Sequence, residues 1–428
     1  MTTATEATTA PDRVEWSAAT RPGASPDGRD RLRLVLVLGF LIALGPLTID
    51  LYLPALPTIM TDLQSTAAAV QLTLTGTLAG LALGQLVVGP LSDALGRRRP
   101  LLVGVGVHIV ASLLCVVAPN LAVLGGLRIL QGLGAAAAAV VAMAVVRDLF
   151  VGLAAAKLFS RLMLVMGAAP ILAPTLGGIV LNWSQWRGVF VVLALFGVGI
   201  VTVTALALPE TLPAERRRSG GVRATVRVYG SLFTDRTFVG LILVAGLAMA
   251  AMFAYVAGSS FVFQEQYGMN EQEFGFTFGV GAIGLIAATQ LNVRLLRRWS
   301  PAQILTRALV AGAVCGLVLL AVAATGAGGL PGVLLPLWLV LASAGLALPN
   351  APALALSRHG EAAGTAAALL GAVQFGVGAL AAPMVGVLGT GAVAMAIVIA
   401  TGMLSAVAVL VLVVRPWLLP ADEPAEAA

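Results

Sequence analysis

The chain has 428 residues, of which 59% are hydrophobic and 10% are charged, and its formal net charge is +6. Soluble domains carry about 25% charged residues, because polar side chains must cover a surface that faces water. The composition therefore argues against a soluble enzyme, a nucleic-acid-binding protein and a disordered scaffold, and it indicates a chain that lies in a lipid bilayer.

Residues 1–33 are rich in Thr, Ala, Pro and charge, and they hold no apolar segment of the kind found in a signal peptide. We expect a disordered cytoplasmic tail, with the first spanning helix acting as the insertion signal. A spanning helix needs about 20 mainly apolar residues, and twelve such runs follow the tail. They lie at 34–56, 70–91, 100–118, 121–146, 158–182, 188–208, 237–261, 274–296, 303–325, 331–355, 362–386 and 390–414.

The basic residues between these runs favour one orientation. With the N-terminus in the cytoplasm, all but two of the 25 Lys and Arg residues fall in cytoplasmic segments, and the two exceptions are Arg128 and Arg187. Loops on the cytoplasmic side of a membrane are enriched in Lys and Arg. The pattern therefore predicts an all-α protein of the cytoplasmic (inner) membrane, with twelve spans and both termini in the cytoplasm.

The chain also divides into two parts. Its longest polar interruption after the tail is 209–236, which contains the run Arg216–Arg218. The spans on either side correspond at an offset of about 200 residues, so that the basic loop at Arg97–Arg99 matches the one at Arg294–Arg298. Parallel six-helix repeats are typical of transporters, whose substrate site lies between the halves. We expect an N-terminal half at 34–208, a cytoplasmic linker at 209–236, a C-terminal half at 237–414 and a cytoplasmic tail at 415–428.

A sharp motif lies between the second and third spans, where residues 89–98 read Gly-Pro-Leu-Ser-Asp-Ala-Leu-Gly-Arg-Arg. The first glycine would permit close helix packing and the second a tight turn, the aspartate could accept hydrogen bonds from a neighbouring helix N-terminus, and the arginines would hold the loop in the cytoplasm. The segment resembles the G-x-L-S/A-D-x-x-G-R-R/K signature of the major facilitator superfamily. That resemblance implies a major facilitator fold and a conformational role, without substrate binding, for Gly89, Asp93, Gly96, Arg97 and Arg98.

Further segments refine the resemblance. Residues 48–57 close the first span, 127–134 open the fourth, 167–178 lie in the fifth and 364–375 in the eleventh. Together they are similar to the Bcr/CflA branch of the twelve-helix drug:proton antiporters, and the resemblance extends over 34–414. One departure is Ala173, where the antiporter motif of the fifth helix usually has Gly before Pro. The resemblance implies conformational roles for Gln131, Gly167, Pro170, Pro174, Gly177 and Gly178.

Asp50 is the only carboxylate well inside a predicted span, and an ionised side chain there is costly unless it is paired or hydrated. Counted at about 1.5 Å per residue, Asp50 and Arg128 lie at comparable depth, and the resemblance implies that the first and fourth helices both line a central cavity. Contact between the two would favour the ionised carboxylate, and losing it would favour the protonated form, as proton coupling requires.

Two other interpretations of these residues stay open. Asp50 could satisfy backbone groups where Pro54 and Pro57 end the first helix, and Arg128 could serve only to fix one helix to another.

The candidate substrate-binding residues are uncharged. A Met and aromatic face in the seventh span could form a soft apolar site for varied ligands, although such a face also suits packing. The polar candidates could touch ligand or make hydrogen bonds between helices. His108 is interpreted as a satisfied structural histidine. The candidates are Tyr52, Met249, Met252, Phe253, Tyr255, Asn350, Gln374 and Phe375.

The energy source follows by exclusion. The only lysine, Lys157, is not part of a Gly-Lys-Ser/Thr sequence, so no P-loop is present, and no metal-ligand or catalytic set is seen. No cofactor is expected, and an ion gradient remains. One charge crossing 100 mV is worth ~2.3 kcal/mol, and since ~1.4 kcal/mol is tenfold, a proton can sustain a gradient of roughly fiftyfold.

These observations predict a non-enzymatic protein that exports small amphipathic drugs or antibiotics by alternating access, driven by a proton gradient. Its expected partners are a small-molecule substrate, protons and the lipid bilayer, without nucleic acid, and the family default is a monomer. A metabolite symporter or exporter of the facilitator type is the nearest alternative. A membrane enzyme or a sensor that transports nothing is a remote one.

Overall fold

The structure is a computed structural model, and it describes residues 28–150, 152–217, 222–359 and 362–418. Within these residues, twelve segments are long and apolar enough to cross a membrane, which confirms the predicted number. The long helices are α1 (Gly28–Asp50), α3 (Ala67–Leu95), α4 (Arg98–Val116), α5 (Leu121–Leu149), α6 (Gly152–Trp183), α7 (Arg187–Ala207), α9 (Arg236–Phe261), α10 (Glu271–Leu295), α11 (Pro301–Thr325), α12 (Gly329–Ser357), α13 (Ala363–Leu388) and α14 (Ala392–Val409).

Side-chain caps fix several of these boundaries. Asn120 accepts the backbone N–H of Val123 (3.0 Å) at the start of α5. Asn270 and Glu273 form a capping box at α10, and Ser300 opens α11 in the same way. Such caps satisfy the first N–H groups of a helix, which have no partner within it. Most predicted boundaries agree with the observed ones within a few residues.

The first predicted run, 34–56, joins elements that the structure separates. α1 ends at Asp50, and the short turn η2 (Leu53–Ala55) leads into α2 (Leu56–Asp62). Pro54 and Pro57 stand in the first turns of η2 and α2, where the missing N–H of proline leaves no helix bond unmade.

Segment 209–236 also holds regular structure that the sequence interpretation did not foresee. It contains the turn η3 (Ala214–Arg216) and the helix α8 (Val222–Leu232). The remaining short elements follow the first and the last helix of the C-terminal half. They are η4 (Val262–Gln266) after α9, and η6 (Leu410–Val414) and η7 (Pro416–Leu418) after α14.

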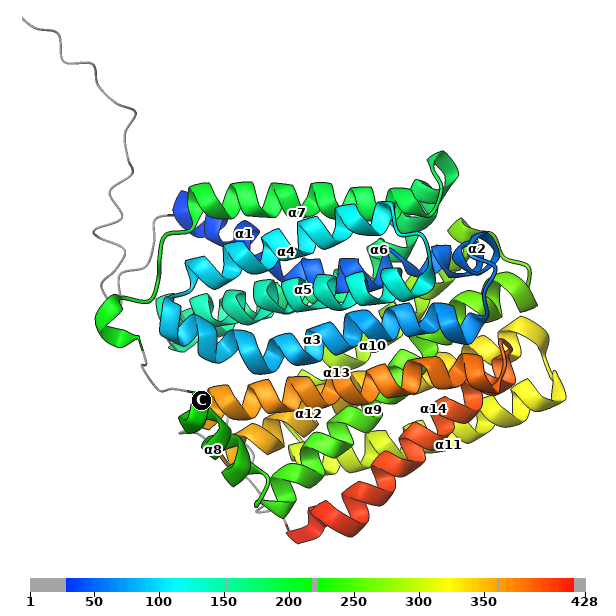
Figure 1. Cartoon of the computed structure of the whole chain (residues 1–428). Helices are drawn as coiled ribbons and strands as arrows, with labels where there is room; N and C mark the ends of the chain where they lie inside the picture. Colours follow the sequence, from blue (N-terminus) through cyan, green and yellow to red (C-terminus); the bar gives the residue numbers. More distant parts are fainter. Residues whose placement is uncertain (1–27, 151, 218–221, 360–361, 419–428) are drawn as a thin grey trace, which may run out of the picture.

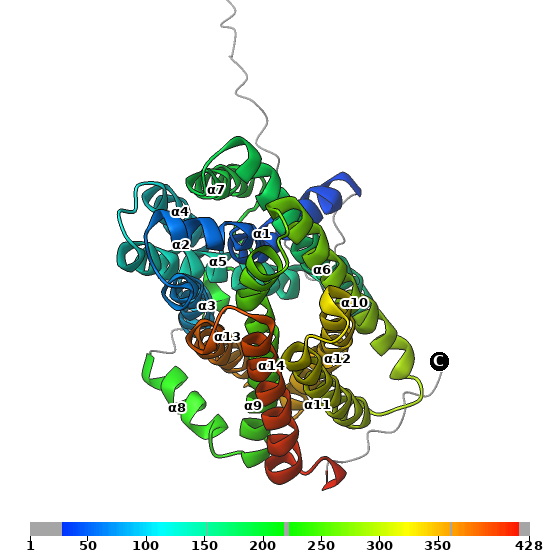
Figure 2. The ribbon, with the colours of Figure 1, turned by 90° about the vertical axis from the view of Figure 1, so that its right-hand side faces the viewer.

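The long helices form two bundles (Figure 1). α1 and α3 to α7 pack mainly on one another, and α9 to α14 do the same. The main contacts between the bundles join α3 to α13 and α6 to α10, as the end-on view in Figure 2 shows. Small residues allow this approach, because a Cβ on Gly275 of α10 would lie 2.8 Å from the backbone of Thr175 in α6.

Hydrogen bonds connect the two bundles at one end of the molecule. We call the end that carries α2 the α2 end, and the end that carries α8 the linker end (Figure 1). At the α2 end, Gln71 of α3 donates to Ala257 O (3.1 Å) and accepts from Gly386 N (2.8 Å), and Ser260 of α9 donates to Leu53 O (2.7 Å). Hydrogen bonds thus join the two halves at the α2 end.

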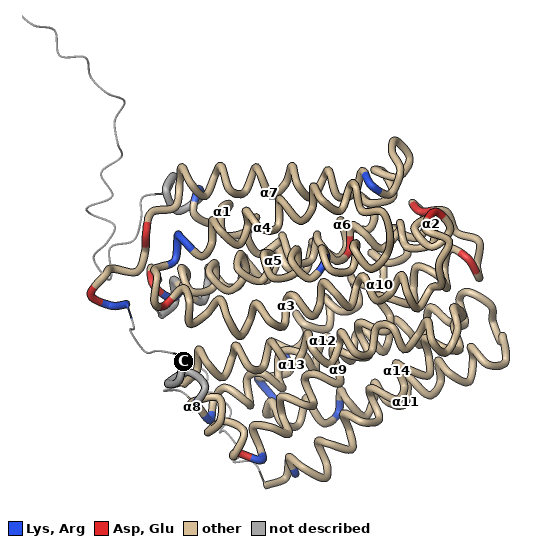
Figure 3. The backbone as a smooth tube through the Cα atoms, viewed as in Figure 1, with Lys and Arg blue, Asp and Glu red and all other residues tan. Residues whose placement is uncertain are grey.

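Charge is distributed unevenly between these ends. Figure 3 shows that basic residues gather at the linker end, together with several acidic ones, while acidic residues mark the region of α2. One end rich in Arg is the arrangement that the loop-charge prediction requires. The side of the membrane on which this end lies stays a prediction.

Candidate functional site

A fully buried polar network surrounds Arg128 on α5. Its Nη1 donates to Gln131 Oε1 (2.8 Å), its Nη2 donates to Thr48 O on α1 (3.0 Å), and its guanidinium carbon lies 4.4 Å from the centre of the Tyr52 ring. The arginine has no exposed surface. A buried charge is tolerated where hydrogen bonds and an aromatic face replace water, and these partners all belong to the N-terminal half.

The network continues to α4. His108 Nε2 lies 2.9 Å from Thr48 Oγ1, and Gln131 Nε2 donates to Ser112 Oγ (2.7 Å). The Thr48 hydroxyl donates its hydrogen bond to Leu44 O (2.6 Å). In the contact between Thr48 and His108, the histidine nitrogen must therefore be the donor. His108 Nδ1 is buried without a hydrogen-bond partner, so the prediction of a fully satisfied histidine holds for one ring nitrogen only.

Asp50, the last residue of α1, lies apart from this network. Its exposed fraction is 6%, and its carboxylate makes no hydrogen bond or ion pair with a residue that the structure describes. It interacts electrostatically with Tyr255 on α9 of the other half. The structure therefore does not bring Asp50 and Arg128 into contact, although they lie near the same level.

Helix geometry explains the separation. Arg128 binds the carbonyl of Thr48, and the Thr48 side chain points to His108. Residues two apart on an α-helix differ in direction by about 200°, so the side chain of Asp50 leaves α1 on nearly the opposite face. The alternative in which Asp50 satisfies backbone groups near Pro54 and Pro57 is not observed among the described residues either.

The predicted apolar candidates lie on α9 and α13, which pack on each other. The rings of Phe253 and Phe375 are 6.2 Å apart, and Tyr255 stacks on Phe278 at 4.9 Å. Met249, Met252 and Gln374 are half-buried, and Gln374 makes no side-chain hydrogen bond within the described chain. Sequence reasoning missed Phe278, although Phe274 and Phe278 share one face of α10 at a spacing of four residues.

Two polar candidates are engaged elsewhere. The Tyr52 hydroxyl lies 2.8 Å from Thr73 Oγ1 and its ring lies beneath Arg128. Asn350 Nδ2 donates to Asn292 Oδ1 (2.7 Å). Both side chains therefore make the contacts between helices that were the alternative to ligand binding.

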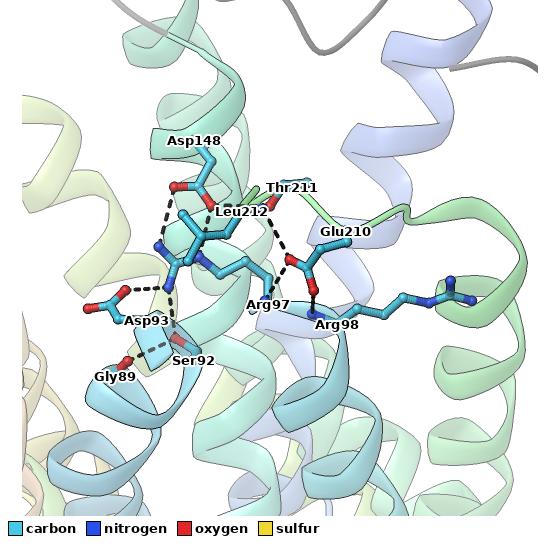
Figure 4. A network of polar contacts seen from close by, with 9 residues as sticks. All are labelled: Gly89, Ser92, Asp93, Arg97, Arg98, Asp148, Glu210, Thr211 and Leu212. Atoms are coloured by element: carbon cyan, nitrogen blue, oxygen red, sulfur yellow. Dashed lines mark hydrogen bonds and ion pairs between the residues drawn. The ribbon is translucent and has the colours of Figure 1, made fainter. Parts of the chain in front are cut away.

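The motif at residues 89–98 builds a second network, at the linker end (Figure 4). Arg97 pairs with Asp93 and, through Nε, with Asp148 Oδ2 at 2.8 Å. Burial opposes the charge of Arg97, but its bonds to Asp148 and Asp93 outweigh that effect and raise the pKa of Arg97. The network ties the loop between α3 and α4 to the end of α5.

Glu210, which the sequence interpretation did not single out, caps α4. Its Oε1 accepts from Arg97 N (2.7 Å) and its Oε2 from Arg98 N (3.2 Å) (Figure 4). The expectation that Asp93 fills this role at a helix N-terminus is wrong, because Asp93 is bound to the Arg97 side chain. The sequence signal that could have identified Glu210 is a carboxylate that directly follows an apolar run and lies beside a basic loop.

The motif glycines differ from each other. Gly96 has a φ of +89°, and a Cβ there would collide with the Glu210 carboxylate, so the predicted tight turn is observed. A Cβ on Gly89 would meet nothing within 4 Å, and the expected close packing at that position is not observed.

Close packing is observed instead along α6. A Cβ on Gly167 would lie 3.2 Å from Ile286, on Gly177 it would meet the backbone of Leu51, and on Gly178 it would lie 2.7 Å from Glu271 O. The helix runs through Pro170 and Pro174 without a break. Since Ile286 and Glu271 belong to α10, two of these glycines set the contact between the halves.

Comparison with known proteins agrees with this architecture. Residues 38–383 match the family model of the Major Facilitator Superfamily, and the chain therefore belongs to that superfamily of transporters, which are not enzymes. A solved structure of the D-xylose-proton symporter covers 91% of this chain, and 98% of its own length is matched, with a TM-score of 0.71 at 15% sequence identity. The fold is thus the major facilitator fold.

Curated relatives narrow the branch. The chain is 38% identical to the uncharacterized MFS-type transporter YdgK of Bacillus subtilis (strain 168), over 90% of this chain and 96% of the relative. It is 32% identical to a bicyclomycin resistance protein homolog of Haemophilus influenzae (82% and 88% covered) and 32% identical to a chloramphenicol resistance protein of Pseudomonas aeruginosa (80% and 81% covered). These relatives confirm the resemblance to the Bcr/CflA type.

Proposed function

We propose that this protein exports small amphipathic drugs or antibiotics in exchange for protons, across the cytoplasmic membrane and with both termini in the cytoplasm. The observation that carries the proposal is the position of Asp50. This carboxylate is buried outside the Arg128 network, it interacts electrostatically with Tyr255 of α9, and within the described chain it has no hydrogen bond or ion pair. An ionised group without partners is costly in such a place, which suits a side chain that binds and releases a proton.

The contacts at the α2 end support the direction of exchange. The hydrogen bonds of Gln71 and Ser260 join the halves at this end, so the substrate of the proposed exchange would enter from the linker end. A drug entering from the cytoplasm would meet Asp50 in its protonated form and displace the proton to the cytoplasm, and the drug would then leave by the opposite side after the halves rock. Proton binding from outside then resets the transporter, as alternating access requires.

The aromatic side chains of α9, α10 and α13 support the substrate class. Tyr255 and Phe278 offer stacked rings, and Phe253 and Phe375 form a second aromatic pair. Beside them, half-buried methionines can adapt to ligands of different shape. Such a surface suits amphipathic molecules, and the resistance proteins named among the relatives support bicyclomycin and chloramphenicol as the first compounds to test.

The proposal is tested by drug-susceptibility profiling of matched strains with and without the gene. Expression should lower susceptibility to at least one of the two compounds, and a protonophore should remove that protection. In inside-out vesicles, adding the exported drug should make protons leave the vesicle lumen. Protection that survives collapse of the proton gradient would contradict the coupling, and protons that move together with the substrate would indicate symport.

A further inference from the structure

A basic cavity of about 300 Å³ opens at the linker end of the C-terminal half. Three arginines from separate elements line it: Arg236 at the start of α9, Arg358 directly after α12 and Arg415 directly after η6. The remaining lining residues are Thr237, Val413, Val414 and Leu418.

One carboxylate, that of Asp235, partly balances these charges. It accepts from the backbone N–H groups of Thr237 (2.8 Å) and Phe238 (3.1 Å) and pairs with Arg358 at 3.3 Å. Burial alone would raise the pKa of Asp235, but the bonds from Phe238, Arg358 and Thr237 lower it. Among the described residues, three arginines against one ionised carboxylate leave an excess of two positive charges.

The arginines differ in what they already bind. Arg236 Nη2 donates to Leu412 O (3.0 Å), and Arg358 is held by Asp235. The Arg415 guanidinium forms no hydrogen bond or ion pair with any described residue. A site with an excess of positive charge and unfilled N–H donors is suited to a phosphate group, which arginine binds through two oxygens.

The surroundings point to a phosphate that carries hydrocarbon chains. Three apolar side chains of the segment 412–418, which contributes four of the lining residues, are largely exposed, Leu412 at 66%, Trp417 at 65% and Leu418 at 68%. Tryptophan is enriched at the membrane interface, and basic pockets between spanning helices bind anionic headgroups. We propose that this cavity binds the phosphate headgroup of an anionic phospholipid, whose acyl chains lie along the exposed apolar residues.

Native mass spectrometry of the purified, delipidated full chain tests this, with phosphatidylglycerol and phosphatidylcholine as probes. The wild type should bind phosphatidylglycerol more tightly. Arg415→Gln should weaken that binding about fivefold, the effect of one basic residue near a charged membrane surface, and Arg415→Lys should keep most of it. Arg298→Gln is the matched control, because Arg298 is an exposed arginine outside the cavity.

The proposal would be overturned by any of three outcomes. Equal binding of the two lipids, or an unchanged affinity in Arg415→Gln, would show that the cavity does not select the headgroup. Displacement of phosphatidylglycerol by inorganic phosphate at millimolar concentration would make the site one for soluble phosphate. A folded Arg358→Gln/Arg415→Gln double variant, checked by size-exclusion chromatography, should lose the preference entirely.

Discussion

Arg128 and Asp50 were expected to form an ion pair, but they have separate surroundings. Arg128 is buried with all its partners in the N-terminal half, whereas Asp50 lies outside this network and interacts electrostatically with Tyr255 of α9. An arginine so enclosed keeps its charge and holds α1 against α5 through the carbonyl of Thr48. The titrating group of the proposed exchange is then the carboxyl alone, and the arginine fixes the helix that carries it.

Asp50→Asn should abolish proton-driven efflux while leaving the protein in the membrane at normal levels. Asparagine has nearly the same shape but binds no proton in the physiological range, so the exchange loses its coupling step. Drug accumulation in energised cells measures this. Asp62→Asn is the control, because Asp62 pairs with Arg187 at the surface of the α2 end. Full efflux in Asp50→Asn, or equal loss in both variants, would contradict the assignment.

Arg128→Lys separates charge from positioning. Lysine keeps the positive charge, but a single ammonium cannot reach Gln131 and Thr48 in the forked geometry of a guanidinium. We expect a loss of about 1–3 kcal/mol of stability from the unpaired buried groups, seen as a lower thermal midpoint in detergent, together with reduced efflux. Unchanged stability would show that the network does not hold α1 to α5.

At the scale of elements, the loop between α3 and α4 is fixed from two sides. Arg97 binds Asp93 and Asp148, and Glu210 caps α4 from the segment that follows α7. The loop is thereby joined to the ends of α5 and α7 within one half. These contacts connect α3, α4, α5 and the segment after α7 at the linker end of the N-terminal half, so we expect this half to move as one unit in a rocking motion.

Glu210→Ala should destabilise the start of α4 by about 0.5–2 kcal/mol, the usual effect of losing a helix N-cap. Two backbone N–H groups, of Arg97 and Arg98, would lose their acceptor. Thermal unfolding of the purified protein measures the change. Glu215→Ala serves as comparison, since Glu215 is exposed in the same segment, and an equal shift in the two variants would rule out the cap.

The same elements show what a sequence can predict. Twelve apolar runs give the spans directly, because a helix must fill the membrane with apolar side chains. Depth along a helix follows from counting residues, and it put Asp50 and Arg128 at similar levels. Their angular positions depend on how each helix is rotated against its neighbours, which only packing decides. The cap by Glu210 was missed for a related reason, since it joins residues far apart in the sequence.

At the scale of the whole molecule, the two halves touch through small residues. Gly178 of α6 faces the backbone of Glu271, and Gly386 of α13 faces the backbone of Ala68. These contacts lie at the α2 end, where the hydrogen bonds of Gln71 also join the halves. Close contact between the two backbones holds the halves together in this state. A rigid rotation of one half can separate them while breaking few hydrogen bonds. Such an interface suits a gate.

Gly178→Val should therefore favour the state that is open at the α2 end. The added side chain would collide with the carbonyl of Glu271, which cannot move without shifting the start of α10. Spin labels on α2 and η4 should report a longer distance between the halves than in the wild type, and efflux should fall. Gly126→Val is the control, because a Cβ at Gly126 meets nothing within 4 Å. If both variants keep the wild-type distance, the close approach at Gly178 does not form the gate.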